Sequence, residues 1–238
     1  MNKIMFCASA VLLVLASCAT DGGPAMNTDY PEPDKICALT FDDGPDSVKT
    51  AKVLNKLEAY GVPATFFLVG SRINNSTKGV MERAKALGCE FGNHSWSYDS
   101  MDKMSAEEIK ESISKTTNAI ETYLGMTPAF FRPPNLATSQ TMFDTIEYTF
   151  ASGVLGYDWD GSTSAKKRAE NVLSGMQDGA IILLHDVQPD PHPTPEALDI
   201  LIPELKMQGY EFVTLSELFK RKGVDPVTNQ DKMWVYVR

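Results

Sequence analysis

The sequence contains few cysteines, only four among 238 residues. Small proteins that depend on disulfide bonds have a much higher cysteine density, so that class is excluded. Glycine and proline, with 16 and 14 residues, are too few for a fibrous protein. Hydrophobic residues make up 43% of the chain, which excludes a disordered protein. A chain of this length can bury one large core, so the sequence predicts a single globular domain.

Basic residues are also scarce. Lysine and arginine total 22 against 31 aspartates and glutamates, which gives a formal net charge of -9. A surface this acidic repels phosphate backbones, and no cluster of lysines or arginines counters it. The composition therefore predicts no nucleic-acid partner.

The N-terminus has the pattern of a targeting segment. Lys3 precedes an apolar run over residues 4–16, which is too short to span a bilayer and is typical of a signal-peptide core. The run ends in Leu15-Ala16-Ser17-Cys18, which resembles the lipobox of bacterial lipoproteins. That resemblance implies cleavage before Cys18 and lipid attachment to its sulfur. The alternative is a plain secretory signal with an incidental cysteine.

The next segment, residues 19–33, is rich in glycine, proline, asparagine and aspartate and predicts a flexible tether. We therefore expect a lipoprotein signal peptide over residues 1–18 and a catalytic domain over residues 34–238. The protein would lie in the bacterial cell envelope, at a periplasmic or outer-membrane face, anchored to a membrane through lipidated Cys18. Within the domain, Cys37 and Cys89 fall in apolar stretches, which favours buried free thiols over a disulfide.

Short apolar runs alternate with segments of helical period from residue 35 onward. This alternation predicts an α/β fold with a parallel sheet, and about seven strand–helix units suggest a closed or nearly closed barrel. The expected strands cover residues 36–41, 64–69, 89–92, 130–131, 154–157, 180–184 and 210–215, and residues 234–237 could add an edge strand.

Polar residues follow these strands directly. In a parallel barrel the carboxyl ends of the strands share one face, where active sites are built. Taken alone, Asp42 and Asp43 could form a solvated turn, and a lone histidine at a strand end is more often structural. Two histidines, two aspartates and an arginine on one rim favour a site instead. His192, in a polar proline-rich stretch, is expected to be solvated and mobile.

The same residues fall in recognisable motifs. In order, they resemble the motifs of the polysaccharide deacetylases, carbohydrate esterase family 4, over roughly residues 35–220. The matching segments are Thr-Phe-Asp-Asp-Gly-Pro at 40–45, His-Ser-Trp-Ser-Tyr at 94–98, Arg-Pro-Pro at 132–134, Asp-Trp at 158–159 and Leu-Leu-His-Asp at 183–186.

The resemblance implies a distorted (β/α) barrel and a metal-dependent deacetylase that binds a divalent metal, usually zinc. On the family pattern, Asp43 and His94 ligate the metal, and Asp42 is the general base for a metal-bound water. Arg132 would orient Asp42. A metal lowers the pKa of a bound water to about 7, which makes it a nucleophile that can attack an amide.

The resemblance also implies an acid and a pocket. His185 would protonate the leaving amine, and Asp158 would tune His185. Trp159 and Leu183 would shape an apolar pocket for the acetyl methyl group, and the backbone N–H of Asn135 would help to hold the oxyanion.

Two positions depart from the family pattern. The family has a second histidine where this chain has Tyr98, and a phenol with a pKa of about 10 is a poor ligand at neutral pH. Two firm ligands remain where three are usual, and Asp99, water or Tyr98 itself could fill the gap. The other departure is Asn135-Leu136 in place of Tyr-Gly.

The sequence therefore predicts a hydrolase that removes acetyl groups from N-acetylated sugars of a polysaccharide or peptidoglycan. A non-catalytic carbohydrate-binding protein on the same fold is one alternative, because loss of a ligand can leave a groove intact. An O-acetyl esterase of the xylan type is the other, since an ester is the easier bond to cleave.

Overall fold

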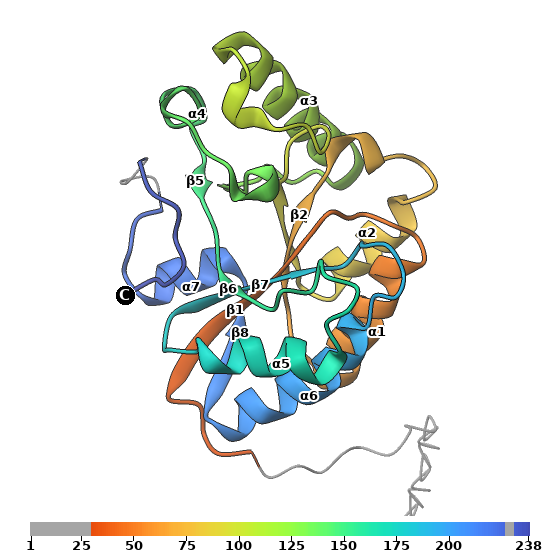
Figure 1. The fold of residues 1–238 in the computed structure, drawn as a ribbon, viewed down its shortest axis with the longest axis vertical. Coiled ribbons are helices and arrows are strands. Elements are labelled where there is room, and N and C mark those ends of the chain that lie inside the picture. Colours follow the sequence, from red (N-terminus) through yellow and green to blue (C-terminus); the bar gives the residue numbers. More distant parts are fainter. Residues whose placement is uncertain (1–29, 227–230) are drawn as a thin grey trace, which may run out of the picture.

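The structure is a computed structural model that describes residues 30–226 and 231–238. Its centre is a curved parallel sheet with the order β5-β4-β3-β2-β1-β7-β6, and β8 pairs with β1 (Figure 1). The strands are β1 (Lys35–Asp42), β2 (Thr65–Leu68), β3 (Glu90–Asn93), β4 (Phe130–Phe131), β5 (Thr149–Phe150), β6 (Val154–Leu155), β7 (Ala180–His185) and β8 (Tyr210–Val213).

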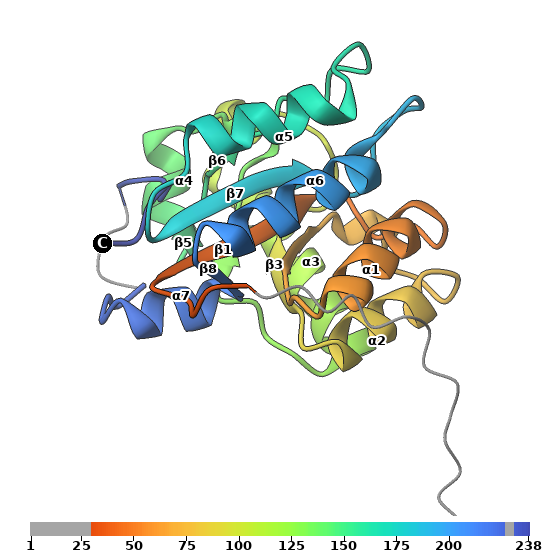
Figure 2. The same cartoon turned by 90° about the horizontal axis from the view of Figure 1, so that it is seen from below.

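Helices connect the successive strands, except β5 and β6, and lie around the outside of the sheet (Figures 1 and 2). They are α1 (Lys49–Tyr60), α2 (Lys78–Ala86), α3 (Ala106–Leu124), α4 (Gln140–Thr145), α5 (Ala165–Ser174), α6 (Thr194–Met207) and α7 (Leu215–Arg221). β5 and β6 end the sheet without pairing with one another, so the barrel stays open between them. The predicted α/β class and distorted (β/α) barrel are confirmed.

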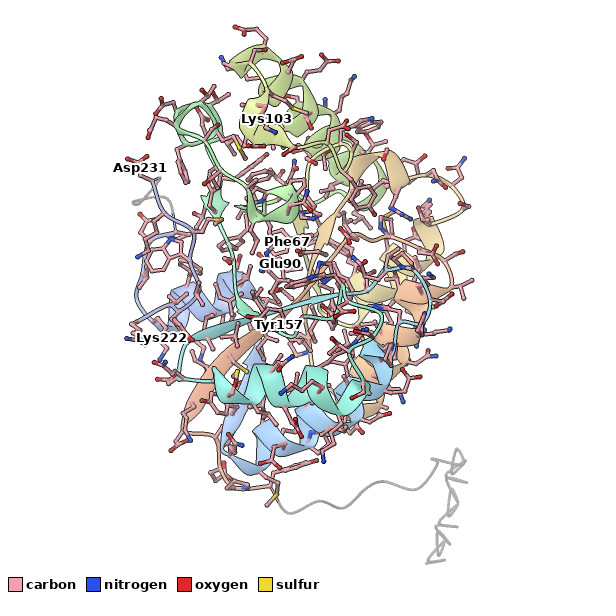
Figure 3. The ribbon with its side chains drawn as sticks, viewed as in Figure 1. Phe67, Glu90, Lys103, Tyr157, Lys222 and Asp231 are labelled. Atoms are coloured by element: carbon pink, nitrogen blue, oxygen red, sulfur yellow. The ribbon has the colours of Figure 1, made fainter. Side chains whose placement is uncertain are left out.

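β1 organises the sheet because both of its faces are buried. Cys37, Leu39 and Phe41 pack toward the helix layer, whereas Ile36 and Ala38 join a second cluster inside the barrel. The interior cluster includes Phe67, and Figure 3 shows its side chain near the middle of the molecule, with Lys222 and Asp231 at the periphery. A strand buried on both faces explains the unbroken apolar run in the sequence.

The strand register places polar groups at one edge. Asp42 pairs with His185 across β1 and β7, at the carboxyl ends of both strands. Side chains alternate along a strand, so Asp42 shares the interior face of β1 with Ala38, and His185 shares that of β7 with Ile181. The two polar ends therefore project into the mouth of the open barrel.

Local signals in the sequence account for several helix starts. Ser105 and Glu108 form a capping box ahead of α3. Asp46 Oδ1 accepts hydrogen bonds from the backbone N–H groups of Val48 and Lys49 at the start of α1. These bonds satisfy amides that the helix leaves free, and they lower the pKa of Asp46.

Four expectations are corrected in detail. The strand expected over residues 210–215 ends at Val213, because Thr214 caps α7 and Leu215 begins that helix. The strand expected over residues 154–157 stops at Leu155, because Tyr157 adopts a positive φ of 55° that takes the backbone out of the sheet. The strand expected over residues 89–92 lies one residue later, as Glu90–Asn93. Residues 234–237 form no strand and make only single bridges, from Trp234 to Ala151 and from Tyr236 to Ala180.

Both domain cysteines are buried and free, as predicted. Burial raises the pKa of the Cys89 thiol to about 11, so it is an inert packing group rather than a reactive one.

The predicted signal peptide, the lipidation site at Cys18 and residues 19–29 of the tether lie outside the described residues. Residues 30–33 of the tether contain neither helix nor strand. Across 30–226 and 231–238, no helix combines the length and the apolar character that a bilayer crossing requires.

Candidate active site

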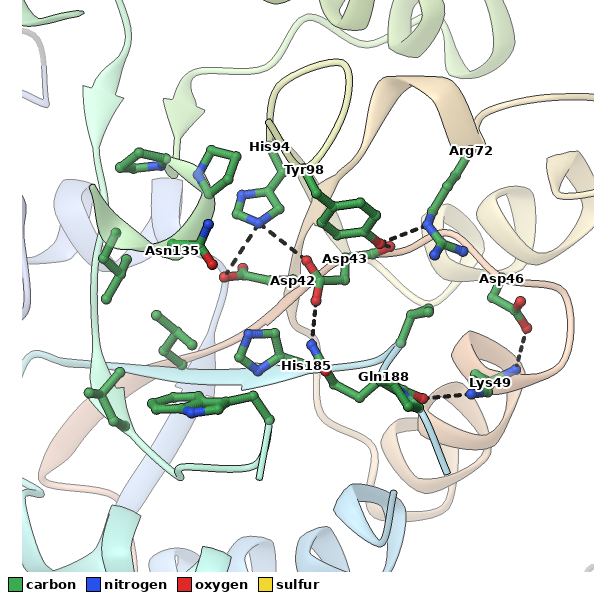
Figure 4. Close-up of a pocket in the computed structure, with 18 residues that line it drawn as sticks. Asp42, Asp43, Asp46, Lys49, Arg72, His94, Tyr98, Asn135, His185 and Gln188 are labelled. Carbon is green, nitrogen blue, oxygen red and sulfur yellow. Dashed lines mark hydrogen bonds and ion pairs between the residues drawn. The ribbon is translucent and has the colours of Figure 1, made fainter. Parts of the chain in front are cut away.

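A pocket of about 810 Å³ opens at the carboxyl ends of the strands, at the mouth of the barrel (Figure 4). Seven of the nine residues predicted from the sequence line it, namely Asp42, Asp43, His94, Asn135, Trp159, Leu183 and His185. The other two, Arg132 and Asp158, are buried behind it and contact Asp42 and His185 respectively. The structure thus brings all nine residues together from five separate strand ends.

His94 is oriented toward the aspartates by a backbone carbonyl. It follows β3 directly, and its Nδ1 lies 2.6 Å from the carbonyl oxygen of Arg132. An N–H at that position leaves Nε2 facing Asp43 Oδ1 at 3.4 Å and Asp42 Oδ2 at 4.0 Å. Burial lowers the pKa of His94, but Asp42 and Asp43 outweigh it and raise the pKa overall.

The donor set formed by Asp43 and His94 fits a divalent cation. A carboxylate oxygen and an imidazole nitrogen converge, and both atom types bind zinc and cobalt well. Gln188 Nε2 donates to Asp43 Oδ2, which directs the other oxygen of the carboxylate toward His94 (Figure 4). Such outer hydrogen bonds orient metal ligands. Within the described ranges, no cluster of three or more His, Cys, Asp or Glu side chains could hold a metal.

Tyr98, one candidate for the third ligand, is engaged by two other groups. Its hydroxyl accepts a hydrogen bond from Arg72 Nε at 2.8 Å and donates one to the carbonyl oxygen of Asp43 at 3.1 Å. Burial and the charge of Asp43 raise the pKa of Tyr98 to about 12, so the phenol keeps its proton. Asp99 accepts from Ser97 Oγ at 2.6 Å and does not line the pocket.

Arg132 holds Asp42 in one orientation. The guanidinium is wholly buried and donates from Nη1 to Asp42 Oδ1 at 2.6 Å. It also donates to the carbonyl oxygens of Ala151 and Ser152, at 3.1 and 2.7 Å, and lies over the ring of Phe67. With Oδ1 of Asp42 bound in this way, Oδ2 is the carboxylate oxygen that faces His94.

His185 and Asp158 form a second pair, at the end of the neighbouring strand β7. The two oxygens of Asp158 bind His185 twice, at the ring Nδ1 (2.7 Å) and at the backbone N–H (2.8 Å). Burial lowers the pKa of His185, but Asp158, Asp42 and Asp43 together raise it to about 9. The imidazole is therefore protonated at neutral pH, and its other nitrogen is the one free to act as an acid.

The walls of the pocket combine apolar and aromatic groups. The Trp159 ring is 46% exposed and lies edge-on to the His185 ring, with 5.9 Å between the centroids. Leu183 shares the interior face of β7 with His185. Asn135 and Leu136 both have φ near +56°, which forms a tight turn after two prolines at the rim.

Sequence reasoning placed His192 wrongly. The side chain is half-buried, and its Nδ1 lies 3.1 Å from Arg168 Nη1. Its Nε2 lies 2.8 Å from the carbonyl oxygen of His185, so His192 packs against the backbone of the site and is not free in solvent. Gln188 was not predicted at all, because a glutamine in a proline-rich loop carries no pattern.

The His185–Asp158 pair predicts a pH-dependent stability. The pKa of His185 rises from 6.5 to about 9 on folding. Its contribution to the free energy of unfolding is therefore complete below pH 6.5 and is lost as the pH rises through 9. We expect the free energy of unfolding to fall by at most about 3 kcal/mol across that window. Urea unfolding with a chelator present measures it. The variant His185→Gln should have a flatter profile; an equally steep one would assign the effect to other groups.

Two polar pairs, a carboxylate held by an arginine and an imidazole held by a carboxylate, thus lie at one pocket of a parallel α/β barrel, an arrangement typical of hydrolase sites. The sequence model for polysaccharide deacetylase matches residues 29–150. A peptidoglycan-N-acetylglucosamine deacetylase of Bacillus cereus is 34% identical over 200 residues, which are 82% of this chain and 92% of that protein. The chain belongs to the polysaccharide deacetylase family.

Relatives linked to xylan share more sequence with this chain. A bifunctional xylanase/deacetylase of Pseudobutyrivibrio xylanivorans is 44% identical over 231 residues, 97% of this chain but 38% of that protein. The chain also spans only 40% of a peptidoglycan deacetylase of Listeria monocytogenes. A family 4 acetyl xylan esterase from Clostridium thermocellum, solved with a cobalt ion, is 55% identical. That match has a TM-score of 0.84 and covers 85% of this chain and 99% of the other.

Proposed function

We propose that this protein hydrolyses acetyl groups from an acetylated polysaccharide, with a divalent cation held by Asp43 and His94. The observation that carries the proposal is the pairing of a base and an acid across one pocket. Asp42 is held by Arg132 at the end of β1, and His185 is held by Asp158 at the end of the neighbouring strand β7. An acyl carbon between them would have both proton-transfer groups within reach.

The chain's own residues supply the proton transfers. A bound cation would polarise the acetyl carbonyl and make a neighbouring water more acidic. Asp42 accepts the proton of the attacking water through the oxygen that faces His94, while Arg132 keeps the carboxylate in place. His185 donates its proton to the departing oxygen or nitrogen, and Asp158 stabilises the imidazolium before that transfer.

The pocket walls would hold the substrate. Trp159 and Leu183 provide an apolar surface for the acetyl methyl group, and the exposed face of Trp159 suits stacking on a sugar ring. The backbone N–H of Asn135, in the turn at the rim, would hold the developing oxyanion.

A second candidate is an esterase that acts on O-acetyl groups of xylan. Its support is the engagement of Tyr98 by Arg72 and Asp43, which leaves two protein ligands for the cation. An ester needs less activation than an amide, so this site suits it better. The acetyl xylan esterase and xylanase relatives agree with that chemistry.

Acetate release tests both candidates. Residues 19–238 would be assayed on N-acetylated chitooligosaccharides and O-acetylated xylooligosaccharides, first with a chelator and then with zinc or cobalt. We expect release that the chelator abolishes and the metal restores, with the preferred substrate identifying the bond. Binding of the oligosaccharides without release at saturating metal would overturn the proposal and indicate a non-catalytic carbohydrate-binding protein.

Replacing Tyr98 tests the cation site directly. In Tyr98→His, an imidazole replaces a phenol that Arg72 and Asp43 hold, and we expect about tenfold tighter zinc binding. Calorimetric titration of zinc measures the change. The matched control Tyr98→Phe removes the hydroxyl without adding a donor and should stay near the wild-type affinity. Equal affinities for all three proteins would show that position 98 lies outside the coordination shell.

We propose, from the sequence pattern around Cys18, that the protein is anchored in the bacterial cell envelope by a lipid on that cysteine. Expression with labelled palmitate should label the full chain and not Cys18→Ser. Equal labelling of the two would reject the anchor, and release of the unmodified protein would indicate the plain secretory signal.

A further inference from the structure

A second fully buried arginine lies outside the pocket. Arg168, on α5, is fully buried. Its guanidinium donates to the carbonyl oxygens of Thr163 (2.9 Å) and Asp160 (3.2 Å), and it contacts Thr194 Oγ1 (2.8 Å) and His192 Nδ1 (3.1 Å). None of these acceptors is a carboxylate. A buried charge without a direct counterion lowers the stability of the fold, so we expect that charge to serve a function.

A short chain of hydrogen bonds connects Arg168 to His185. The hydroxyl of Thr194 accepts from Arg168 and donates to Asp158 Oδ2 at 2.8 Å. The other oxygen of Asp158 binds the imidazole of His185. The order is thus guanidinium, hydroxyl, carboxylate, imidazole, and the buried carboxylate lies between two cations.

Arg168 also binds the segments whose residues form this hydrogen-bonded series. Its bonds to Thr163 and Asp160 hold the loop that bears Asp158. Its contact with His192 makes Nδ1 the acceptor of that ring, so the Nε2–H donates to the carbonyl oxygen of His185. Arg168 does not line the pocket, so it acts through other residues.

We propose that Arg168 is a positioning residue that keeps Asp158 ionised while His185 changes between its protonated and neutral forms. This inference rests on the proposed function, in which His185 gives up a proton in every turnover. When that proton leaves, the buried Asp158 loses its adjacent cation. Arg168, one hydroxyl away, remains charged and compensates it, so His185 can release its proton at a lower cost.

The other charges around His185 act in the opposite direction. Asp158 faces it from the loop after β6, and Asp42 and Asp43 face it from the end of β1. All three favour the protonated imidazole. Arg168 opposes them from the α5 side. His192 lies between Arg168 and the backbone carbonyl of His185, and burial lowers its pKa, which favours the neutral ring.

The titration of His185 tests the proposal. The chain has three histidines, so their imidazole NMR signals can be assigned with single-histidine variants. In Arg168→Met we expect the pKa of His185 to rise by about one pH unit. Arg168→Lys keeps the charge and should restore most of the wild-type value. Arg221→Met, which removes an exposed arginine paired with Glu211, is the matched control and should change nothing.

Thr194→Val keeps the inference testable if Arg168→Met does not fold. It removes the bridging hydroxyl with little change in volume, and it should raise the pKa of His185, as Arg168→Met does. An unchanged or lower pKa of His185 in a folded Arg168→Met or Thr194→Val protein would overturn the proposal.

Kinetics give a second readout. A higher pKa makes His185 a weaker acid, so kcat should fall about threefold and its pH optimum should move upward, with KM unchanged because Arg168 lies outside the pocket. A fall in kcat at an unmoved optimum would contradict the proposal. The NMR titration needs no turnover, so it stands even if the protein proves inactive on every substrate, which would reject the proposed function alone.

Discussion

Replacing Asp42 with asparagine is expected to lower kcat for acetate release by about 10³-fold, the order expected for loss of a general base. The amide keeps the shape of the side chain, and its oxygen can still accept the hydrogen bond from Arg132 Nη1. It cannot take a proton from water. Initial rates at saturating zinc on the preferred oligosaccharide measure the effect.

A measurement of zinc affinity distinguishes loss of the base in Asp42→Asn from loss of the bound metal. Because Asp43 and His94 are unchanged in Asp42→Asn, we expect its zinc affinity to stay within about tenfold of the wild type. Asp199→Asn, which alters an exposed aspartate paired with Lys56 on the outer helices, is the matched control and should keep full activity. If Asp42→Asn hydrolysed its substrate at nearly the wild-type rate, another group would have to be the base.

The parts of the site that could be predicted from the sequence are those fixed by strand ends. Asp42, His94 and His185 each follow a buried apolar run, and parallel pairing must bring such ends to one edge. Their identities then matched the family motifs, which gave Arg132 and Asp158 as partners. In the structure Arg132 contacts Asp42, and Asp158 contacts His185.

The residues that escaped prediction have no local signal. Arg168 lies in a helix rich in charged residues, where an arginine is usually a solvated surface group, yet its position in α5 faces the loop after β6. Gln188 reaches Asp43 across 145 residues of sequence. Tyr98 was recognised as a departure, but its two hydrogen bonds depend on Arg72, which belongs to no motif.

Replacing Arg132 with methionine is expected to give the largest loss of stability, about 3–5 kcal/mol, because it leaves a buried carboxylate without its partner. Methionine can fill part of the space beside Phe67, but it cannot donate to Asp42, Ala151 or Ser152. Urea unfolding with a chelator measures the loss. A change of that size should lower the melting temperature by roughly 10 °C in a domain of this size. Arg83→Met, which alters a half-buried arginine in a surface ion pair with Glu58, is the matched control and should be nearly neutral.

A double-mutant cycle with Asp42→Asn assigns the cause of that loss. If the cost comes from the uncompensated charge of Asp42, neutralising it in the Arg132→Met protein should recover about 1–2 kcal/mol, so that the two changes are not additive. If the cost comes from the unsatisfied carbonyl oxygens of Ala151 and Ser152, the double variant should be no more stable than Arg132→Met. Recovery would show that the main role of Arg132 is to hold Asp42 ionised at the end of β1. The charge of Asp42 that destabilises Arg132→Met is also the charge that lets Asp42 act as a base in the proposed reaction.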